Sequence, residues 1–353
     1  MTTNDTPQGA YAAAGVDIDA GNRAKELMRA SVRSTHRPEV LTELGGFSGL
    51  FALGPLGMRD PILVTSIDGV GTKLKVAFTL GRHDSIGADL VAHCVNDILV
   101  CGARPLMFLD YLALGDVAPE HAAAVVAGVA MGCRAAGCAL IGGETAQMPS
   151  FYAAGEYDLA GCIIGIVERD AIVTGEHIAA GDVVVGLPSV GLHTNGYSLA
   201  RSVFADDDWH TSIAEFGRSI GEELMQQHRS YLVPIRGVLD DAALAGAVTG
   251  MAHITGGGLL ENIPRVVPAG LGVDLDATRW DILPIFRVIQ ARGAVEWSEM
   301  TRVFNLGIGY VVMVRPDAAD AVLERLHDVG GRIIGTVTTR SSGACVRVEG
   351  LPQ

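Results

Sequence analysis

The chain has 353 residues, of which 49% are hydrophobic, and this is enough to build two domains that each have their own core. Its formal net charge of −14 argues against general binding to nucleic acids or to anionic membranes. The six cysteines form no C-x-x-C pair, so we interpret them as buried residues in a reducing compartment. There is no secretory signal and no apolar run long enough to span a bilayer, which predicts a cytoplasmic protein.

The first half of the chain alternates predicted strands and helices. Residues 1–20 are small and polar and are expected to form a mobile arm. Apolar periodicity predicts that the elements following it are helices at 22–34, 83–105 and 119–136 and strands at 60–68, 105–114, 138–149 and 156–169. In the second of these helices, Gly102 suits the left-handed backbone that ends a helix, and Pro105 prevents its continuation.

The stretch SIDGVGTKLK, from Ser66 to Lys75, directly follows the first predicted strand. It resembles a phosphate loop but lacks the spacing of a Walker A motif, so a plain turn is the alternative interpretation. The chain has only three lysines, and Lys73 and Lys75 both lie in this stretch. A compact ammonium group fits among crowded phosphates better than a guanidinium group does.

Three acidic residues of the first half stand beside glycines at the ends of predicted elements, and they are Asp68, Asp97 and Glu144. Each could be only a cap or a turn residue. Together they predict a Mg²⁺–nucleotide site, because hard divalent cations prefer carboxylate oxygens. Asp97 falls near the C-terminal end of its helix, where the helix dipole disfavours an anion, so a metal ion or a basic partner is expected beside it.

The second half begins after a turn-rich segment at 170–182, which predicts domains at 1–170 and 171–353. A strand at 182–189 leads through a glycine-rich loop at 190–204 into a helix, and an acidic surface insertion is expected at 206–222. Residues 251–268 give a strand end, three glycines and a short helix. A strand at 303–316, a helix at 317–330 and two closing strands follow. The fold class is α/β (α+β), with a mixed N-terminal sheet and a C-terminal α+β domain.

Two glycine-rich loops of the second half are predicted to bind anions through backbone N–H groups. One contains His193 and Asn195, and the other, Thr255 to Gly258, follows His253. Histidine titrates near neutral pH, so His193 and His253 are candidate proton-transfer groups, although loop histidines are often structural. Seven other histidines lack such surroundings and are interpreted as surface or capping residues: His36, His83, His121, His177, His210, His228 and His327.

These motifs carry a resemblance to a known family over nearly the whole chain. DGVGTKLK, NDILVCGARP, GGETAQMP, VGLHTNGYSLAR and HITGGGLLENIP occur in the expected order, and the chain resembles the phosphoribosylformylglycinamidine cyclo-ligase (AIR synthetase) family. The resemblance implies ATP-dependent ring closure of formylglycinamidine ribonucleotide in purine biosynthesis, with Mg²⁺ and commonly K⁺. It also implies a homodimer whose N-terminal sheets pair into a barrel, and a small phosphoribosyl substrate as the binding partner.

The resemblance assigns expected roles to individual residues. The catalytic candidates are His193, Lys73 and His253, and the metal ligands are Asp68, Asp97 and Glu144. Expected ATP-binding residues are Asp68, Gly69, Gly71, Thr72, Lys73, Asn96, Asp97, Gly143, Glu144 and Thr145. Expected substrate-binding residues are His193, Asn195, Thr255, Gly256, Gly257 and Gly258.

Some positions depart from the family pattern. The family usually has Ser-Ser-Gly at 189–191, Pro-Thr-Arg at 227–229 and Glu at 104 and 147, whereas this chain has Val190, Gln227-His228, Arg104 and Gln147. Rival interpretations are another ATP-using enzyme of the same superfamily, such as a selenophosphate synthetase or a thiamine-phosphate kinase, and a catalytically silent nucleotide-binding relative.

Overall fold

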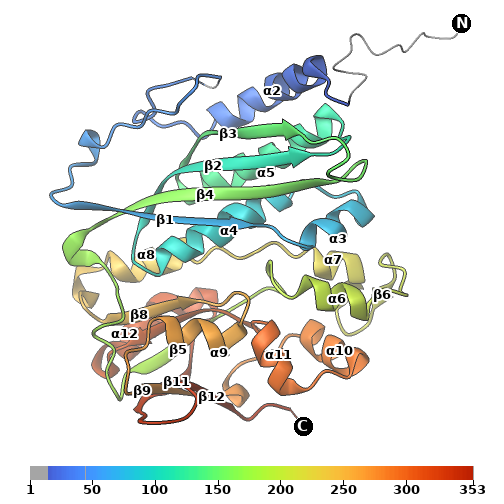
Figure 1. Ribbon diagram of the computed structural model, residues 1–353. Helices are drawn as coiled ribbons and strands as arrows, with labels where there is room; N and C mark the ends of the chain where they lie inside the picture. The colour runs from blue at the N-terminus through green and yellow to red at the C-terminus, as the bar shows by residue number, and fades with distance from the viewer. Residues whose placement is uncertain (1–14, 44, 353) are drawn as a thin grey trace, which may run out of the picture. The chain divides into compact units, whose positions relative to one another are not determined.

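The structure is a computed structural model that describes residues 15–43 and 45–352 (Figure 1). The described residues form two compact units. The first unit takes its residues from 1–58, 65–94 and 105–164, and the second from 59–64, 95–104 and 165–353. The division falls inside helix α4 (Ile86–Leu99), so Asn96 and Asp97 belong to the second unit although they lie in the first half of the sequence.

The first unit contains a four-stranded sheet with the strand order β1-β4-β2-β3. In chain order its helices and strands are α2 (Ile18–Arg33), η1 (Gly54–Leu56), β1 (Pro61–Gly69), α3 (Lys73–Leu80), α4, β2 (Arg104–Leu114), α5 (Pro119–Ala136), β3 (Ala139–Gln147) and β4 (Tyr157–Glu168). The predicted strands and the helix at α5 are confirmed within a few residues. Gly102 has a φ of +76° just beyond α4, as the sequence predicts for the end of that helix.

Helix α2 begins one turn earlier than the sequence predicts. The Asp17 side chain accepts a hydrogen bond from the Ala20 amide and caps the helix. Gln147 fixes this cap from β3, because its Oε1 accepts from the Asp17 amide at 2.6 Å and its Nε2 donates to the Asp17 carbonyl at 2.8 Å. A glutamate could not make the second bond, so the departure at Gln147 has a structural role here. Residues 1–14 of the predicted arm lie outside the described residues.

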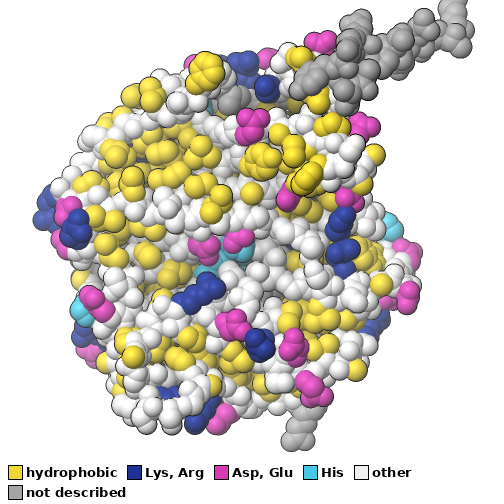
Figure 2. Space-filling view, in the orientation of Figure 1, with side chains coloured by type: hydrophobic (Ala, Val, Ile, Leu, Met, Phe, Trp, Pro, Cys, Tyr) yellow, Lys and Arg dark blue, Asp and Glu magenta, His cyan; other side chains and the backbone are white. Residues whose placement is uncertain are grey.

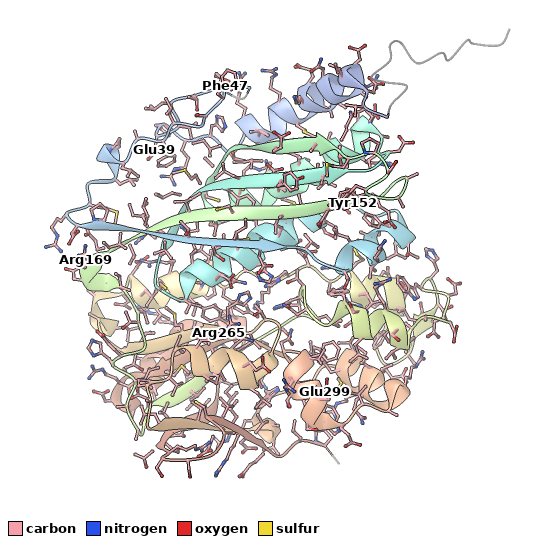
Figure 3. All side chains as sticks on the ribbon, in the orientation of Figure 1. Glu39, Phe47, Tyr152, Arg169, Arg265 and Glu299 are labelled. Atoms are coloured by element: carbon pink, nitrogen blue, oxygen red, sulfur yellow. The ribbon has the colours of Figure 1, made fainter. Side chains whose placement is uncertain are left out.

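One face of the four-stranded sheet carries exposed apolar side chains. Ile67 on β1 is 72% exposed, and Leu109 and Tyr111 on β2 are 36% and 42% exposed. Figure 2 shows hydrophobic side chains gathered over this part of the molecule. Phe47, in the loop between α2 and β1, is also fully exposed (Figure 3). Apolar patches of this kind often mark contact surfaces with other proteins. The sheet is open within one chain, with β1 and β3 at its edges.

The opposite face of β2 carries a buried carboxyl group. Asp110 pairs with Gly143 on β3, and a Cβ at Gly143 would lie 2.1 Å from Asp110 Oδ1, so this position needs glycine to leave room for the carboxyl group. Burial raises the pKa of Asp110 to about 7. Between the model-peptide value near 4 and about 7, the folded protein therefore keeps a proton that the unfolded chain loses.

Asp110→Asn is expected to become more stable relative to the wild type as the pH rises. The wild-type chain loses stability from Asp110 between about pH 4 and pH 7, and a shift of this size corresponds to at most about 4 kcal/mol. Urea unfolding of both proteins at pH 5 and pH 8 measures the difference. The exposed carboxyl of Asp84 supplies a matched control in Asp84→Asn, and an equal wild-type-to-D110N difference at both pH values would contradict the prediction.

The second unit is built on a six-stranded sheet with the order β12-β9-β11-β5-β10-β8. Of the strand pairs described in this sheet, only β12 and β9 run parallel. Its strands and α-helices are β5 (Val183–Pro188), α6 (Tyr197–Val203), β6 (Ser212–Ile213), β7 (Arg218–Ser219), α7 (Ile220–Leu224), α8 (Leu232–Leu239), β8 (Val248–His253), α9 (Gly258–Asn262), β9 (Leu271–Asp276), α10 (Pro284–Gly293), α11 (Trp297–Val303), β10 (Ile308–Val314), α12 (Ala319–Leu326), β11 (Arg332–Thr339) and β12 (Val346–Glu349).

Short 3-10 helices complete the connections, and they are η2 (Arg169–Ala171), η3 (Ala242–Leu244), η4 (Ile263–Arg265), η5 (Ala277–Arg279), η6 (Pro316–Ala318) and η7 (His327–Val329). Strand β10 lies between β5 and β8 and is buried along its whole length, so it forms the centre of the core. The predicted insertion at 206–222 contains the β6–β7 pair, and its Ile213 and Ile220 are buried. Among the described residues, no helix is both long and apolar enough to cross a membrane.

Candidate functional site

The stretch from Ser66 to Lys75 folds as a strand, a turn and a helix. Strand β1 ends at Gly69, Gly71 has a left-handed φ of +71°, and α3 begins at Lys73 with Thr72 as its N-cap residue. The Gly69 amide donates a hydrogen bond to Asp68 Oδ1 at 2.7 Å. Glycine is favoured at position 71 because other residues adopt this backbone conformation only at a cost.

Lys73 is fully buried and forms an ion pair with Asp89 of α4. Its Nζ lies 2.6 Å from Asp89 Oδ2, and both side chains are 0% exposed. Burial lowers the pKa of Lys73, and the nearby Asp89 carboxylate opposes that effect. The Lys73 ammonium therefore links α3 to α4 within the first unit through its ion pair with Asp89. Contact with a phosphate would require this turn to rearrange, so a catalytic or nucleotide-binding role for Lys73 stays a prediction.

Asp68 points toward α4. Its Oδ2 lies 2.7 Å from Nε2 of His93, a largely buried residue one helical turn after Asp89. The sequence placed His93 on this helix but gave it no role. The four-residue spacing of Asp89 and His93 indicates that both lie on one face of a helix. No local pattern in the sequence shows that β1 brings Asp68 to that face of α4.

Glu144 lies on the other side of the sheet from Asp68. Glu144 is exposed on edge strand β3 and pairs with Tyr111 of β2, so both side chains lie on the open face of the sheet. Asp68 lies on β1, the opposite edge strand, and its side chain is on the helix side of the sheet. Three strand spacings separate these edges, which is about 14 Å. One ion cannot bind both carboxylates of the same chain directly. The assignment of Asp68, Asp97 and Glu144 as metal ligands, and of the neighbouring Thr145 as an ATP contact, stays a prediction.

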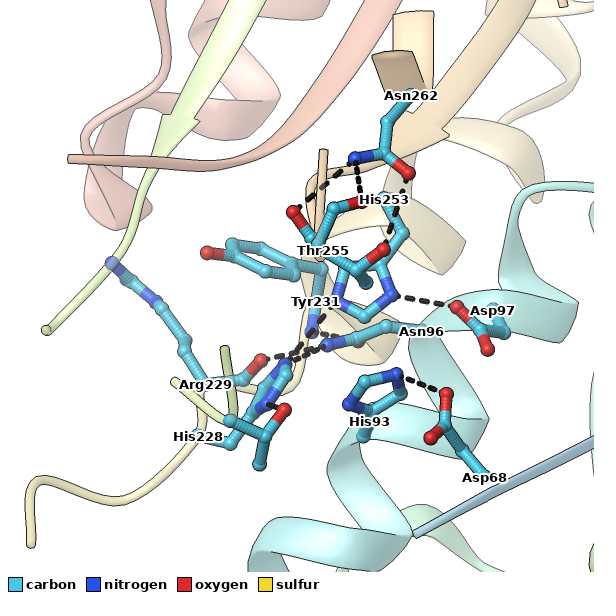
Figure 4. Close-up of polar contacts among 12 residues, drawn as sticks. Asp68, His93, Asn96, Asp97, His228, Arg229, Tyr231, His253, Thr255 and Asn262 are labelled. Carbon is cyan, nitrogen blue, oxygen red and sulfur yellow. Dashed lines mark hydrogen bonds and ion pairs between the residues drawn. The ribbon is translucent and has the colours of Figure 1, made fainter. Parts of the chain in front are cut away.

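In the second unit, Asp97 has the basic partner that the sequence led us to expect. His253, the last residue of β8, places its Nδ1 2.8 Å from Asp97 Oδ1 (Figure 4). The neighbouring Asn96 ties α4 to the segment before α8. Its Oδ1 accepts from the Tyr231 amide at 2.9 Å, and its Nδ2 donates to the Arg229 carbonyl at 2.9 Å. These two bonds fix which end of the Asn96 amide faces which group.

His228 was interpreted as a surface or capping residue from the sequence, and this is wrong. The residue is 2% exposed and its Nε2 lies 3.2 Å from Nε2 of His253 and 3.2 Å from Nδ2 of Asn96. Its ring stacks on His193 with 4.2 Å between the ring centroids. It comes from a polar run, Gln226 to Ser230, that has no apolar period, so the sequence offered no signal of burial. His36 and His83 are also part-buried rather than on the surface.

His193 is held in an uncommon conformation. It is buried and has a left-handed φ of +61°, which is rare for residues other than glycine. Tyr197 donates a hydrogen bond to the His193 carbonyl at 3.1 Å, and the Val190 amide donates to His193 Nε2 at 3.4 Å. The neutral ring therefore carries its proton on Nδ1. Because Val190 contributes only its backbone, the departure at this position leaves that bond intact.

The two predicted anion loops lie together in the second unit. A Cβ at Gly256 would lie 3.4 Å from Asn195 Oδ1, so the loop of His193 borders the loop of Thr255 to Gly258. Gly257 and Gly258 both have left-handed φ angles. The Asn195 Nδ2 is buried, and it has no hydrogen-bond partner among the described residues. Such an atom in a native protein calls for an explanation, and a bound ligand is one. The short helix predicted after the three glycines is α9, which has five residues.

Asn262, a residue of α9 with no role predicted from the sequence, shapes the glycine loop. Its Nδ2 donates to the carbonyls of Thr255, Gly256 and Gly258 at 3.3, 3.1 and 2.8 Å. The Thr255 hydroxyl donates in turn to Asn262 Oδ1 at 3.1 Å. Asn262 therefore holds three carbonyl groups of the glycine loop from one side.

Asn262→Ala is expected to lower the free energy of unfolding by about 1–3 kcal/mol, since it leaves the buried Gly258 carbonyl and two part-buried carbonyl groups without their donor. It should also speed hydrogen exchange at the amides of residues 256–258. Urea unfolding and hydrogen-exchange mass spectrometry measure the two effects. Gln227→Ala, at an exposed position of the same unit, is the control. Wild-type exchange in the glycine loop of Asn262→Ala would show that Asn262 does not shape it.

Comparison with known proteins assigns this fold and site to a class. A family described as "AIR synthase related protein, N-terminal domain" matches residues 57–167, and "AIR synthase related protein, C-terminal domain" matches residues 179–347. The chain is thus an AIR synthase-related protein.

Similar curated proteins define the family within this class. The phosphoribosylformylglycinamidine cyclo-ligase of Desulfitobacterium hafniense is 52% identical over 335 residues, which are 94% of this chain and 98% of the relative. The cyclo-ligase of Geobacillus kaustophilus is 51% identical over 97% of this chain and 98% of its own. That of Trichlorobacter lovleyi is 48% identical with the same coverage. The chain belongs to the phosphoribosylformylglycinamidine cyclo-ligase family.

Solved structures with low sequence identity share the fold. The hydrogenase maturation protein HypE of E. coli is 19% identical, with a TM-score of 0.67 over 94% of both chains. A HypE in complex with ATP is 17% identical, with a TM-score of 0.65. The thiamine-monophosphate kinase of Stenotrophomonas maltophilia is 18% identical, with a TM-score of 0.66 over 92% of this chain and 96% of its own. The kinase named as a rival therefore shares the architecture, whereas the sequence places this chain with the cyclo-ligases.

Proposed function

We propose that this chain uses ATP to close the imidazole ring of formylglycinamidine ribonucleotide, giving aminoimidazole ribonucleotide, ADP and phosphate. The observation that carries the proposal is an identity of about one half to named cyclo-ligases over nearly the full length of both chains. The matched residues make up 94–97% of this chain, so the match extends over both units.

The proposed chemistry needs ATP because the amide oxygen is a poor leaving group. The formamide oxygen attacks the γ-phosphorus, the bond to the β-phosphate oxygen breaks, and ADP leaves. The ring-forming nitrogen then attacks the activated carbon. The C–O bond breaks, inorganic phosphate carries the oxygen away, and the nitrogen loses a proton. The protein's contribution is to position the two substrates and to stabilise the phosphate charges.

The second unit offers groups suited to the phosphorylated substrate. Backbone amides of residues 255–257 and the Asn195 amide, whose buried Nδ2 has no partner within the part of the chain that the structure describes, are donors for a phosphate or an amide oxygen. His193 is our first candidate for the proton transfer and His253 the second.

ATP and Mg²⁺ are proposed to bind through the acidic residues of the first half and the turn after β1. Asp68 and Asp97 have side chains 41% and 28% exposed, and Glu144 is exposed, so all three present oxygen ligands that Mg²⁺ accepts. When bound, Mg²⁺ would offset the negative charge of the phosphates.

A homodimer is proposed from the open face of the four-stranded sheet. Ile67, Leu109 and Tyr111 expose apolar surface there, and Glu144 shares that face. Pairing two such faces would bury them as a sheet-on-sheet core. Light scattering of wild type and Ile67→Arg measures the mass, and a monomeric wild type would remove the proposal.

The described cysteines are all free, which agrees with a reducing compartment such as the cytoplasm.

The deciding experiment follows ADP release and aminoimidazole formation from ATP and Mg²⁺, with and without formylglycinamidine ribonucleotide. Equal amounts of both products only when this substrate is present are expected. ATP hydrolysis without ring closure would point to another ATP-using enzyme of the superfamily. ATP binding without turnover would indicate a silent relative. Replacing K⁺ by Na⁺ in the same assay tests the expected potassium requirement.

A further inference from the structure

We propose that Asn305 is a positioning residue, which holds the loop of His193 in place beside the glycine loop of residues 255–258. Its relevance to turnover rests on the proposed function, in which both loops offer donors to the ribonucleotide. Asn305 lies in the short connection between α11 and β10 and is 3% exposed. The sequence predicts it only as part of a buried strand at 303–316. Asn305 and both loops belong to the second unit.

The side-chain amide of Asn305 holds the turn that follows β5. Its Oδ1 accepts from the Ser189 hydroxyl at 2.8 Å and from the Gly307 amide at 2.9 Å, and its Nδ2 donates to the Gly191 carbonyl at 3.0 Å. A backbone N–H can only donate and a carbonyl can only accept, so the backbone partners fix which end of the amide is which. The Ser189 amide also donates to the Gly307 carbonyl at 2.9 Å. Asn305 therefore ties residues 189–191 to the connection that leads into β10.

The turn held in this way contacts the His193 ring. Val190 is the middle residue of the turn, and its amide donates to His193 Nε2 at 3.4 Å. A Cβ at Gly309 would lie 2.6 Å from Cε1 of the same ring, so the start of β10 limits the ring as well. His193 has a left-handed φ of +61°, and surrounding contacts must hold such a conformation. A shift of the turn relative to β10 would therefore move the ring.

The same connection packs against the glycine loop. A Cβ at Gly258 would lie 2.8 Å from the Phe304 carbonyl oxygen, and a Cβ at Gly196 would lie 2.1 Å from Cε1 of the Phe304 ring. Phe304 thus packs against both loops at once. Just beyond the connection, the Ile254 amide, directly before the glycine loop, donates to the Gly309 carbonyl at 3.0 Å. The connection and the start of β10 are therefore a common support for both loops.

The backbone beside Asn305 is strained. Leu306 has a left-handed φ of +49°, which is uncommon for a bulky residue, and Gly307 follows with a φ of +99°. The Nε1 group of Trp280 donates to the Leu306 carbonyl at 3.0 Å. Backbone of this kind persists only where surrounding contacts hold it, and it gathers at functional sites. The bond from the Gly307 amide to Asn305 is one of these contacts.

Two substitutions grade the loss of the clamp. Asn305→Ala removes all three side-chain bonds, whereas Ser189→Ala removes one and leaves the other two. We expect Asn305→Ala to lower kcat/KM for the ribonucleotide by about 100-fold, as displacement of a site by about 1 Å can, with KM for ATP changed less than about threefold. Ser189→Ala should lower the same kcat/KM by about three- to tenfold, which corresponds to the loss of one hydrogen bond.

Thr249→Val is the matched control, because it removes a buried hydroxyl at the opposite end of β10. Thr249 is 4% exposed, and its Oγ1 donates to Asp182 Oδ2 at 2.7 Å and lies 3.3 Å from the Met313 carbonyl oxygen. This variant should lose stability in urea but keep the wild-type kcat/KM. A wild-type kcat/KM in Asn305→Ala would overturn the proposal. So would activity losses in all three variants that follow their free energies of unfolding.

Hydrogen exchange tests the positioning without any turnover. We expect Asn305→Ala to speed exchange at the amides of residues 190–196 and 255–258 by about fivefold or more, whereas Thr249→Val leaves both loops as in the wild type. Wild-type exchange in both loops of Asn305→Ala would refute the positioning role even in an active enzyme. An inactive wild type whose loops respond as expected would instead refute the proposed reaction and support the positioning role.

Discussion

Asp89→Asn is expected to lower the free energy of unfolding by about 3–5 kcal/mol, because it leaves the Lys73 ammonium buried without its partner. The pair has 2.6 Å between its charged atoms, and neither side chain is exposed. Desolvation already opposes the charged form of Lys73, so the loss of the carboxylate would force the ammonium either to release its proton or to draw water into the core. Urea unfolding, followed by hydrogen exchange in α3 and α4, measures the effect.

Two comparisons make this result specific to burial. Lys73→Met combined with Asp89→Leu removes both charges and should recover most of the lost stability, since a buried ion pair adds little over apolar packing. Glu156→Gln breaks the neighbouring pair with Lys75, which has 2.7 Å between its charged atoms but lies at the surface, and should cost about 0–1 kcal/mol. Equal losses in Asp89→Asn and Glu156→Gln would show that burial does not strengthen the effect.

The same pair shows what the local motif could not reveal about the surroundings of Lys73. Glycines, a threonine and a rare lysine after a strand are the residues that a phosphate loop would contain. The fate of the ammonium depends on Asp89, which stands sixteen residues later and reaches Lys73 only when α4 packs beside α3. No pattern within the loop contains that information. The glycines of the loop did indicate a turn, because the left-handed backbone at position 71 favours glycine.

Long periodic elements were predictable, whereas several short ones were not. Helix α4 shows its apolar period clearly, and Gly102 ends it as expected. The sequence also led us to expect a basic partner for Asp97, which proved to be His253. By contrast, α3, α8, α11 and β9 have six to eight residues each, too few for a period to be distinguished from chance, and tertiary packing determines them.

Buried polar residues that support the site were the hardest to foresee. His228 and Asn262 are both 2% exposed, yet each lies in a stretch that reads as polar loop or short helix. Their roles come from partners far away in the chain, such as Asn96, or from backbone carbonyls of a loop whose conformation the sequence does not specify. The chemical type of such residues is visible in the sequence, but their burial depends on the assembled core.

His193→Asn is expected to lower kcat by about 10²- to 10⁴-fold, the usual effect of removing a general acid or base. Asparagine is the better replacement than alanine, because it tolerates the left-handed φ of +61° at this position. His193→Ala should lose as much activity but more stability, since it adds backbone strain and leaves a gap between His228 and β10.

The measurement for His193 is steady-state formation of the aminoimidazole product, with KM determined for ATP and for the ribonucleotide. His210→Asn, at an exposed histidine of the same unit, is the matched control and should retain the wild-type kcat. A rise in KM for the ribonucleotide with kcat unchanged would make His193 a binding group rather than a proton carrier. Full activity of His193→Asn would remove His193 from the mechanism and leave His253 as the remaining candidate for the proton transfer.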